Sequence, residues 1–212
     1  MKKTAEMVII GGGISGLSTA FNLASRGMKD IVLLEKGFLM SGSTGRCGAG
    51  VRMQWGTEMN CALSKATCEI FENINEILDF EGDTEFEQGG YLLMAITEKE
   101  EEQFKKNIEL QHSLGIPSEL LTPQEALDIV PDLNIEGIRS CAFCAKDGHA
   151  NPFRTMQAYA EAAQRHGVEI YTYTEATGID VVDGKVKGVE TNKGYIATDK
   201  ILIAAGAWSQ HI

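Results

Sequence analysis

Long hydrophobic runs are missing from this sequence: no stretch approaches the roughly 18 consecutive apolar residues that a membrane-spanning helix needs. Lys2 and Lys3 precede an apolar run, but glycines interrupt that run almost at once, unlike the core of a secretory signal peptide. Cysteine is also scarce, with five in the chain. Cysteines in a protein without an export signal are usually reduced thiols, so we expect a cytoplasmic protein.

Basic residues are too few to balance the acidic ones. The chain has 19 Lys and Arg against 30 Asp and Glu, which gives a formal net charge of −11. A negatively charged protein repels the phosphates of nucleic acids and of anionic lipids. We therefore expect neither nucleic acid nor a membrane as a partner.

Glycine, in contrast, is abundant and clustered near the start. Four of the 23 glycines occur in the run GGGISG, at positions 11, 12, 13 and 16. This run lies between a β-prone apolar segment, Met7–Ile10, and a segment from Ile14 to Arg26 whose apolar residues recur at helical spacing. A second apolar segment, Ile31–Leu34, ends in Glu35. The pattern predicts a strand, a glycine-rich turn, a helix and a second strand.

This arrangement is typical of a dinucleotide-binding site. Gly11 permits the tight turn, Gly13 allows the backbone to approach a pyrophosphate, and Gly16 allows the helix to pack closely on the strand. The N-terminus of the helix offers unpaired N–H groups to the phosphates. Glu35 is placed to accept hydrogen bonds from a ribose diol. Glycines alone would indicate only a turn, but the flanking strand, helix and acid make the prediction specific.

The rest of the chain departs from a nicotinamide-binding fold, which would continue through further β-α-β units. A glycine- and serine-rich segment, residues 37–58, comes first, and a loop of this length is usually functional. The spacing then predicts a helix from Thr57 to about Phe80, whose apolar stripe consists of Leu63, Ala66, Ile70, Ile74, Ile77 and Leu78. Further expected elements are a strand at 89–96, helices at 98–114 and 123–130, a strand at 137–145, a helix from 152, a three-stranded meander and a strand at 201–204.

The sequence resembles the N-terminal part of FAD-dependent amine oxidoreductases of the D-amino-acid oxidase and glycine oxidase superfamily. The motif GSTGRCGAGVRMQWGTEMN is most similar to sarcosine oxidase β subunits and dye-linked L-proline dehydrogenase β subunits. The other segments that carry the resemblance are residues 8–35, DGHANP at 147–152 and ILIAAGAW at 201–208.

The resemblance implies FAD as the cofactor and a set of residues that contact it. Those in the glycine turn and at the end of the second strand are Gly11, Gly13, Ile14, Ser15, Gly16, Glu35 and Lys36. Those in the following loop and in the C-terminal part are Ser43, Thr44, Gly45, Arg46, Ala176, Ala205, Gly206 and Trp208. No metal is implied.

The resemblance also implies an α/β fold with a glutathione-reductase-like, Rossmann-type FAD-binding domain and part of an antiparallel α+β substrate domain. The expected division places residues 1–81 and 147–212 in the FAD-binding domain and residues 82–146 in the substrate domain. Family members continue well beyond residue 212, so we expect these 212 residues alone to be an incomplete catalyst. In the β subunits, other subunits of a hetero-oligomer complete the enzyme.

The implied activity is oxidation of an amino-acid amine, such as sarcosine or proline, by hydride transfer to flavin N5. Arg52 lies where amine-oxidising relatives hold a substrate carboxylate, and a guanidinium can bind a carboxylate through two hydrogen bonds. Arg52 is equally well explained as a surface residue of a loop. Two other functions stay open: an FAD-dependent alcohol dehydrogenase related to glycerol-3-phosphate dehydrogenase, and a non-catalytic flavin-binding fragment.

The pair Cys141 and Cys144 has the C-x-x-C spacing of zinc ligands or of a redox pair. A structural zinc needs two more ligands at suitable spacing. If the segment is a strand, the two thiols point to opposite faces, which disfavours a shared metal. Buried structural thiols are therefore the favoured interpretation.

Overall fold

The computed structural model describes residues 1–212, which divide into two compact units. Unit 1 comprises residues 1–48, 75–84 and 152–212, and unit 2 comprises residues 49–74 and 85–151. This division differs from the expected one chiefly at residues 49–74, which we had assigned to the cofactor domain. They belong to unit 2 because Cys61 and Cys68 share a hydrophobic core with Val51, Ile116 and Cys144.

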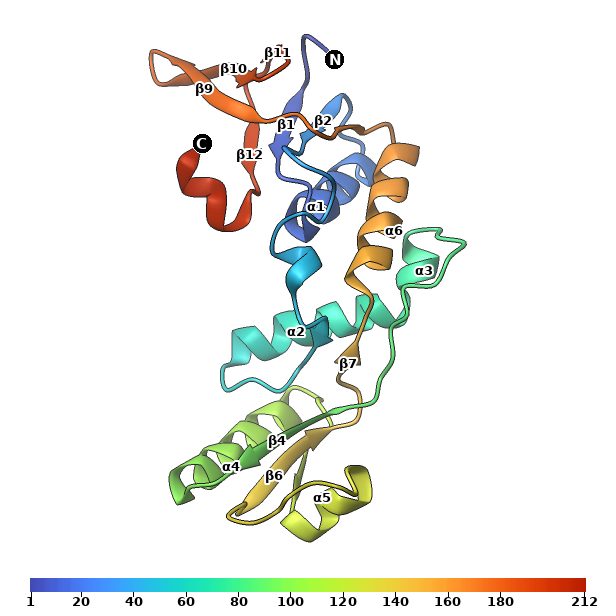
Figure 1. Cartoon of the computed structure of the whole chain (residues 1–212), viewed down its shortest axis with the longest axis vertical. Coiled ribbons are helices and arrows are strands. Elements are labelled where there is room, and N and C mark those ends of the chain that lie inside the picture. The colour runs from blue at the N-terminus through green and yellow to red at the C-terminus, as the bar shows by residue number, and fades with distance from the viewer. The chain divides into compact units, whose positions relative to one another are not determined.

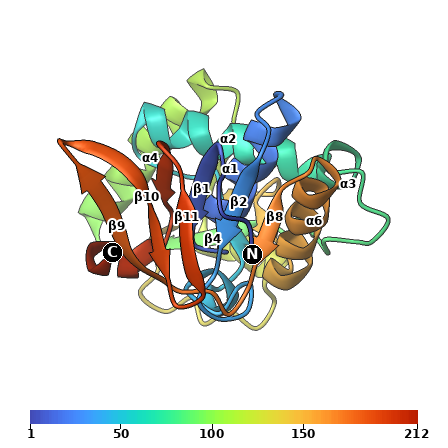
Figure 2. The same ribbon diagram turned by 90° about the horizontal axis from the view of Figure 1, so that it is seen from above.

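Unit 1 is built on a parallel sheet with the strand order β12-β1-β2-β8. Its strands are β1 (Met7–Ile10), β2 (Ile31–Leu34), β8 (Glu169–Tyr171) and β12 (Ile201–Ile203). Figure 2 shows β1, β2 and β8 side by side, with α6 (Pro152–Arg165) packed beside α1 (Ile14–Ser25). All four residues of β2 are buried, as a parallel strand covered on both faces requires. The predicted α/β fold is confirmed.

A three-stranded antiparallel meander completes unit 1 (Figure 1). Its strands are β9 (Ala176–Val182), β10 (Lys185–Thr191) and β11 (Gly194–Ala197). The hairpin between β9 and β10 turns at Asp183 and Gly184, which both have positive φ, 51° and 72°. Two successive positive φ values are typical of a tight hairpin turn, and Asp-Gly is a pair that tolerates them. A short 3-10 helix, Gly206–His211, follows β12.

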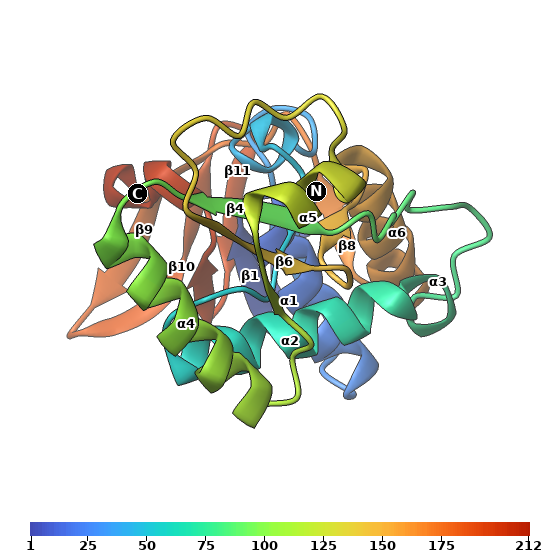
Figure 3. The same ribbon diagram turned by 90° about the horizontal axis from the view of Figure 1, so that it is seen from below.

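Unit 2 contains an antiparallel sheet in the order β4-β6-β5, formed by β4 (Tyr91–Ala95), β6 (Ser140–Cys144) and β5 (Glu119–Leu121). Two helices contact this sheet, α4 (Glu98–Ser113) and α5 (Pro123–Ile129) (Figure 3). Each helix begins with a capping box. A Thr hydroxyl accepts a hydrogen bond from the third helical N–H, and the Glu at that position accepts one from the Thr backbone.

The helix predicted over residues 57–80 is shorter than expected, and a different face of it is buried. It forms α2 (Glu58–Glu72), followed by the single turn α3 (Ile74–Ile77). The predicted apolar stripe is wrong within α2, where Leu63 and Ile70 are 60% and 39% exposed, whereas Ile74 and Leu78 beyond α2 are buried as predicted. The buried positions of α2 are Cys61 and Cys68, seven residues apart and so on one face of the helix. No helix of the chain is both long enough and apolar enough to cross a membrane.

Candidate cofactor site

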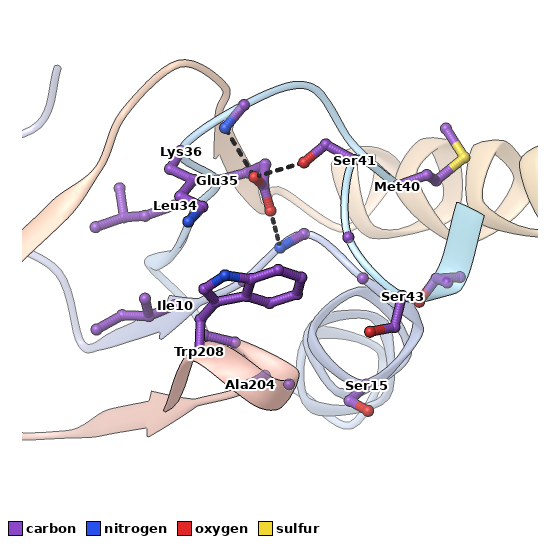
Figure 4. Close-up of a pocket in the computed structure, with 18 of the residues that line it drawn as sticks. Ile10, Ser15, Leu34, Glu35, Lys36, Met40, Ser41, Ser43, Ala204 and Trp208 are labelled. Carbon is purple, nitrogen blue, oxygen red and sulfur yellow. Dashed lines mark hydrogen bonds between the residues drawn. The ribbon is translucent and has the colours of Figure 1, made fainter. Parts of the chain in front are cut away.

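A pocket of about 760 Å³ opens at the carboxyl ends of β1 and β2 in unit 1. This is the edge of an open parallel sheet where ligands bind. The N-terminus of α1, the end of β2, the loop after it and the segment after β12 line the pocket (Figure 4). Thirteen of the predicted cofactor residues line it: Gly11, Gly13, Ile14, Ser15, Glu35, Lys36, Ser43, Thr44, Arg46, Ala176, Ala205, Gly206 and Trp208.

Two glycines of the motif, Gly11 and Gly16, lie so close to other backbone atoms that no side chain could be accommodated. Gly11 has φ +117°, and a Cβ placed on it would overlap the carbonyl of Ala204. A Cβ at Gly16 would overlap the carbonyl oxygen of Gly11. Gly16 does not line the pocket. Its position instead allows α1 to approach the end of β1, which is the packing role that its place in the motif predicts.

The carboxylate of Glu35 organises the pocket wall from a buried position, 9% exposed. Oε2 accepts a hydrogen bond from the backbone N–H of Gly12 at 2.8 Å. Oε1 accepts one from the N–H of Gly37 at 2.8 Å and one from the Ser41 hydroxyl at 3.3 Å (Figure 4). The carboxylate therefore connects the glycine turn to the loop after β2. Each carboxylate oxygen has two lone pairs, so Oε2 can accept a second hydrogen bond, from a hydroxyl group.

The loop after β2 is held against the N-terminus of α1. The Thr44 hydroxyl lies in the short 3-10 helix Thr44–Arg46 and accepts a hydrogen bond from the Ile14 N–H at 3.2 Å. The Met40 N–H donates to the Gly12 carbonyl at 3.4 Å. Gly45 does not line the pocket, but a Cβ there would overlap the Met40 carbonyl oxygen. The predicted residues of this loop therefore lie together beside the glycine turn and the N-terminus of α1.

The segment after β8 reaches the pocket by pairing with the end of β2. The Glu35 N–H donates to the Tyr171 carbonyl at 2.9 Å, and the Thr174 N–H donates to the Glu35 carbonyl at 2.8 Å. This brings Thr174 and Glu175, as well as Ala176, into the pocket lining. Thr174 and Glu175 carry no sequence pattern that indicates this position, because only the pairing of distant strands places them here.

Two predicted residues from different segments meet at the pocket. The Lys36 ammonium lies 5.2 Å from the centre of the Trp208 ring, within cation–π distance. Trp208 extends into the pocket from the short 3-10 helix that follows β12 (Figure 4). Gly12, Met40, Ser41 and His211 also line the pocket without having been predicted. Of these, Gly12 had a visible signal, because it stands inside the triple glycine.

Arg52 belongs to unit 2 and is not part of this pocket lining. It follows β3 (Gly50–Val51), and its guanidinium carbon lies 4.2 Å from the centre of the Trp55 ring. The Trp55 indole N–H donates to the Arg52 carbonyl at 2.9 Å. The Trp55 carbonyl in turn accepts a hydrogen bond from the Gln111 side chain of α4 at 2.8 Å. Arg52 and Trp55 therefore form one compact surface group.

Cys141 and Cys144 are both buried in β6. Burial raises the pKa of both thiols. Burial also raises the pKa of Cys68 to about 11, which keeps its thiol protonated. No group of three or more His, Cys, Asp or Glu side chains is arranged to hold a metal. A protonated, buried thiol is a poor nucleophile, so these cysteines act as small core residues.

Comparisons with known proteins place the chain in a family. Residues 6–212 match the family model of FAD dependent oxidoreductases, so the chain belongs to that family, whose cofactor is FAD. The L-proline dehydrogenase from P. horikoshii superposes with a TM-score of 0.93 and 39% identity, over 100% of this chain and 55% of that chain.

Curated relatives include sarcosine oxidase subunit beta of Rhodobacter capsulatus, 29% identical over 98% of this chain and 51% of the relative. Another is anaerobic glycerol-3-phosphate dehydrogenase subunit A1 of Haloferax volcanii, 34% identical over 100% of this chain and 38% of the relative. The chain thus spans about half or less of the length of these relatives.

Proposed function

We propose that the pocket of unit 1 binds FAD and that the whole protein oxidises an amino-acid amine, such as sarcosine or proline. The observation that supports this most strongly is the pocket itself. A close-packed glycine turn, the N-terminus of α1 and a buried acid at the end of β2 lie around one cavity. Its residues fit a dinucleotide carrying a pyrophosphate and a ribose diol.

The residues of unit 1 hold the cofactor in this proposal. The N–H groups at the start of α1, with the dipole of that helix, stabilise the negative pyrophosphate. The buried carboxylate of Glu35 accepts hydrogen bonds from the ribose hydroxyls. Lys36 and Trp208 contribute a cation and an aromatic face at the pocket wall. The redox chemistry would be supplied by bound FAD, as acceptor of a hydride from the substrate carbon next to nitrogen.

Arg52 is the residue that we assign to the substrate carboxylate. A guanidinium can form two parallel hydrogen bonds with a carboxylate. Contact with the Trp55 ring, at 4.2 Å from the guanidinium carbon to the ring centre, restricts the Arg52 side chain, which lowers the entropy lost on binding. An amino acid fits such a site, and its amine must be presented unprotonated for oxidation.

A second candidate is oxidation of an alcohol, and one observation favours it. The glycerol-3-phosphate dehydrogenase subunit has a higher identity to this chain than the sarcosine oxidase subunit has. A phosphate-bearing alcohol could also be bound by Arg52, since guanidinium binds phosphate as well as carboxylate.

Steady-state turnover with an artificial dye as electron acceptor separates the two candidates. The full-length natural protein is assayed with sarcosine, L-proline, glycine and glycerol 3-phosphate. Turnover of an amino acid and not of glycerol 3-phosphate supports amine oxidation, and the reverse preference supports the alcohol. Flavin-loaded protein that turns over none of the four would favour a non-catalytic flavin-binding subunit.

We also propose that the protein works with partner subunits, as the names of its β-subunit relatives suggest for those proteins. Copurification of a tagged full-length protein from its own cells tests this. A stoichiometric second polypeptide is the expected result, and a catalytically complete protein without one would contradict the proposal.

A further inference from the structure

Asp147 is the one fully buried carboxylate of unit 2, and the proposed chemistry does not use it. Its Oδ1 accepts a hydrogen bond from the Met53 backbone N–H at 2.7 Å. Its Oδ2 accepts one from the side-chain amide of Gln54 at 2.9 Å. Both donors lie immediately after Arg52 in the chain. A buried charge is costly, so its retention here needs an explanation.

The backbone around Asp147 is tied into the same region. The Gly90 N–H donates to the Asp147 carbonyl at 2.8 Å, and the Gln54 amide also donates to the Tyr91 carbonyl at 2.9 Å. The next two residues form β7 (Gly148–His149), which pairs with β3 so that Gly50 faces His149 and Val51 faces Gly148. Residues 147–149 therefore bind the backbone before Arg52 through strand pairing and the residues after it through the Asp147 carboxylate.

Close packing leaves this arrangement little freedom. A Cβ on Gly50 would overlap the Tyr91 hydroxyl, and a Cβ on Gly148 would overlap the Glu87 carbonyl oxygen. On the far side, Trp55 is held by its bond to Arg52 and by the Gln111 amide of α4. The backbone that carries Arg52 is therefore fixed at 50–51 by strand pairing and at 53–54 by one carboxylate.

We infer that Asp147 is a positioning residue that fixes the Arg52–Trp55 pair for binding a substrate carboxylate. Its charge strengthens the hydrogen bonds to Met53 and Gln54, because bonds to an ionised acceptor are roughly twice as strong as neutral ones. Burial raises the pKa of Asp147, while the Met53 and Gln54 bonds and the nearby Arg52 charge lower it. This inference rests on the proposed role of Arg52 and adds the residue that orients it.

The test uses Asp147→Asn in the flavin-loaded, full-length protein. Asparagine keeps the shape and one acceptor oxygen but presents an NH₂ group to the Gln54 amide, which already donates. We expect KM for the amino acid, and Kd for a simple carboxylate inhibitor, to rise about tenfold or more. The FAD content and kcat should change by less than about threefold. Asp132→Asn, at an exposed site of the same unit, is the matched control and should leave all four values unchanged.

A double-mutant cycle with Arg52→Ala distinguishes positioning from general destabilisation. If Asp147 acts through Arg52, Asp147→Asn adds little to KM once Arg52 is alanine. Additive effects, or an unchanged KM in Asp147→Asn, would overturn the inference while leaving the role of Arg52 intact. If Arg52→Ala itself leaves carboxylate binding unchanged, the proposed role of Arg52 fails, and this inference fails with it. Thermal melting of each variant confirms that folded protein is compared.

Discussion

The geometry of the pocket in unit 1 depends on the contacts of a few individual residues. Gly16 has no side chain at the point where the Gly11 carbonyl oxygen approaches it. The Glu35 carboxylate accepts hydrogen bonds from both the Gly12 and the Gly37 N–H groups and so connects the two segments. A change of one methyl group or one oxygen at these positions therefore alters the pocket directly.

Gly16→Ala should destabilise unit 1 and weaken cofactor binding. The new Cβ would overlap the Gly11 carbonyl oxygen, which belongs to the backbone and cannot move independently of the turn. Overpacking of this kind typically costs about 1–3 kcal/mol in the free energy of unfolding. Denaturant unfolding measures this loss. Gly48→Ala is the control, because a Cβ there meets nothing within 4 Å. Equal stability of the two variants would contradict the packing role of Gly16.

Glu35→Gln should weaken FAD binding while the fold is retained. Glutamine keeps one acceptor oxygen for the pocket wall but loses the charge and the second acceptor. A charge-assisted hydrogen bond contributes about 1.5–3 kcal/mol, so we expect the Kd for FAD to rise roughly 10- to 100-fold. Fluorescence titration of the apoprotein measures it, with Glu81→Gln, exposed in the same unit, as the control. An unchanged Kd would refute the assignment of Glu35 to the ribose.

At the scale of single helices and strands, the sequence predicts features whose interacting residues are close together in the chain. The Thr97–Glu100 and Thr122–Glu125 capping boxes are visible as sequence patterns, because both partners lie within one helical turn. The Asp183-Gly184 turn is equally local. The inner face of α2 was not predictable in this way. Two cysteines, rather than Leu63 and Ile70, face the core, and only the tertiary partners of the helix decide that.

The candidate site also combines residues that the sequence predicts with residues that only the tertiary structure brings together. Its glycine turn and Glu35 belong to one β-α-β unit and could be predicted from their spacing. Thr174 and Glu175 could not, because they enter the pocket through the pairing of β2 with β8, which lie far apart in the sequence. Asp147 belongs to the DGHANP motif, but its bonds to Met53 and Gln54 could not be predicted, since these donors lie about ninety residues earlier in the chain.

The capping boxes also make the stability of α4 depend on pH. The N–H groups of Ile96 and Thr97 donate to the Glu100 carboxylate and hold its pKa below the ordinary value for glutamate. An acid with a lowered folded pKa adds stability above its unfolded pKa and loses it as pH falls through the folded value. We expect the free energy of unfolding to fall below about pH 4.5, and to fall less steeply in Glu100→Gln. Glu102→Gln on the same helix is the control, and an identical slope in all three proteins would contradict this.

At the scale of the whole molecule, the proposed function assigns different tasks to the two units: cofactor binding to unit 1 and substrate binding to unit 2. The pocket with the features of a dinucleotide site is lined only by unit 1, whereas the Arg52–Trp55 pair and Asp147 belong to unit 2. Cofactor binding and substrate selection are therefore expected to respond to different substitutions. Variants of Glu35 should change the Kd for FAD, and variants of Arg52 should change KM for the amino acid.

The most direct test of the account is anaerobic titration of the flavin-loaded, full-length protein, because it does not depend on the electron acceptor. Sarcosine, L-proline and glycerol 3-phosphate are added separately, and the oxidised flavin absorbance is followed. If the protein oxidises an amino-acid amine, one of the amino acids bleaches the flavin and glycerol 3-phosphate does not. Bleaching by glycerol 3-phosphate alone, or protein that carries no FAD at all, would contradict it.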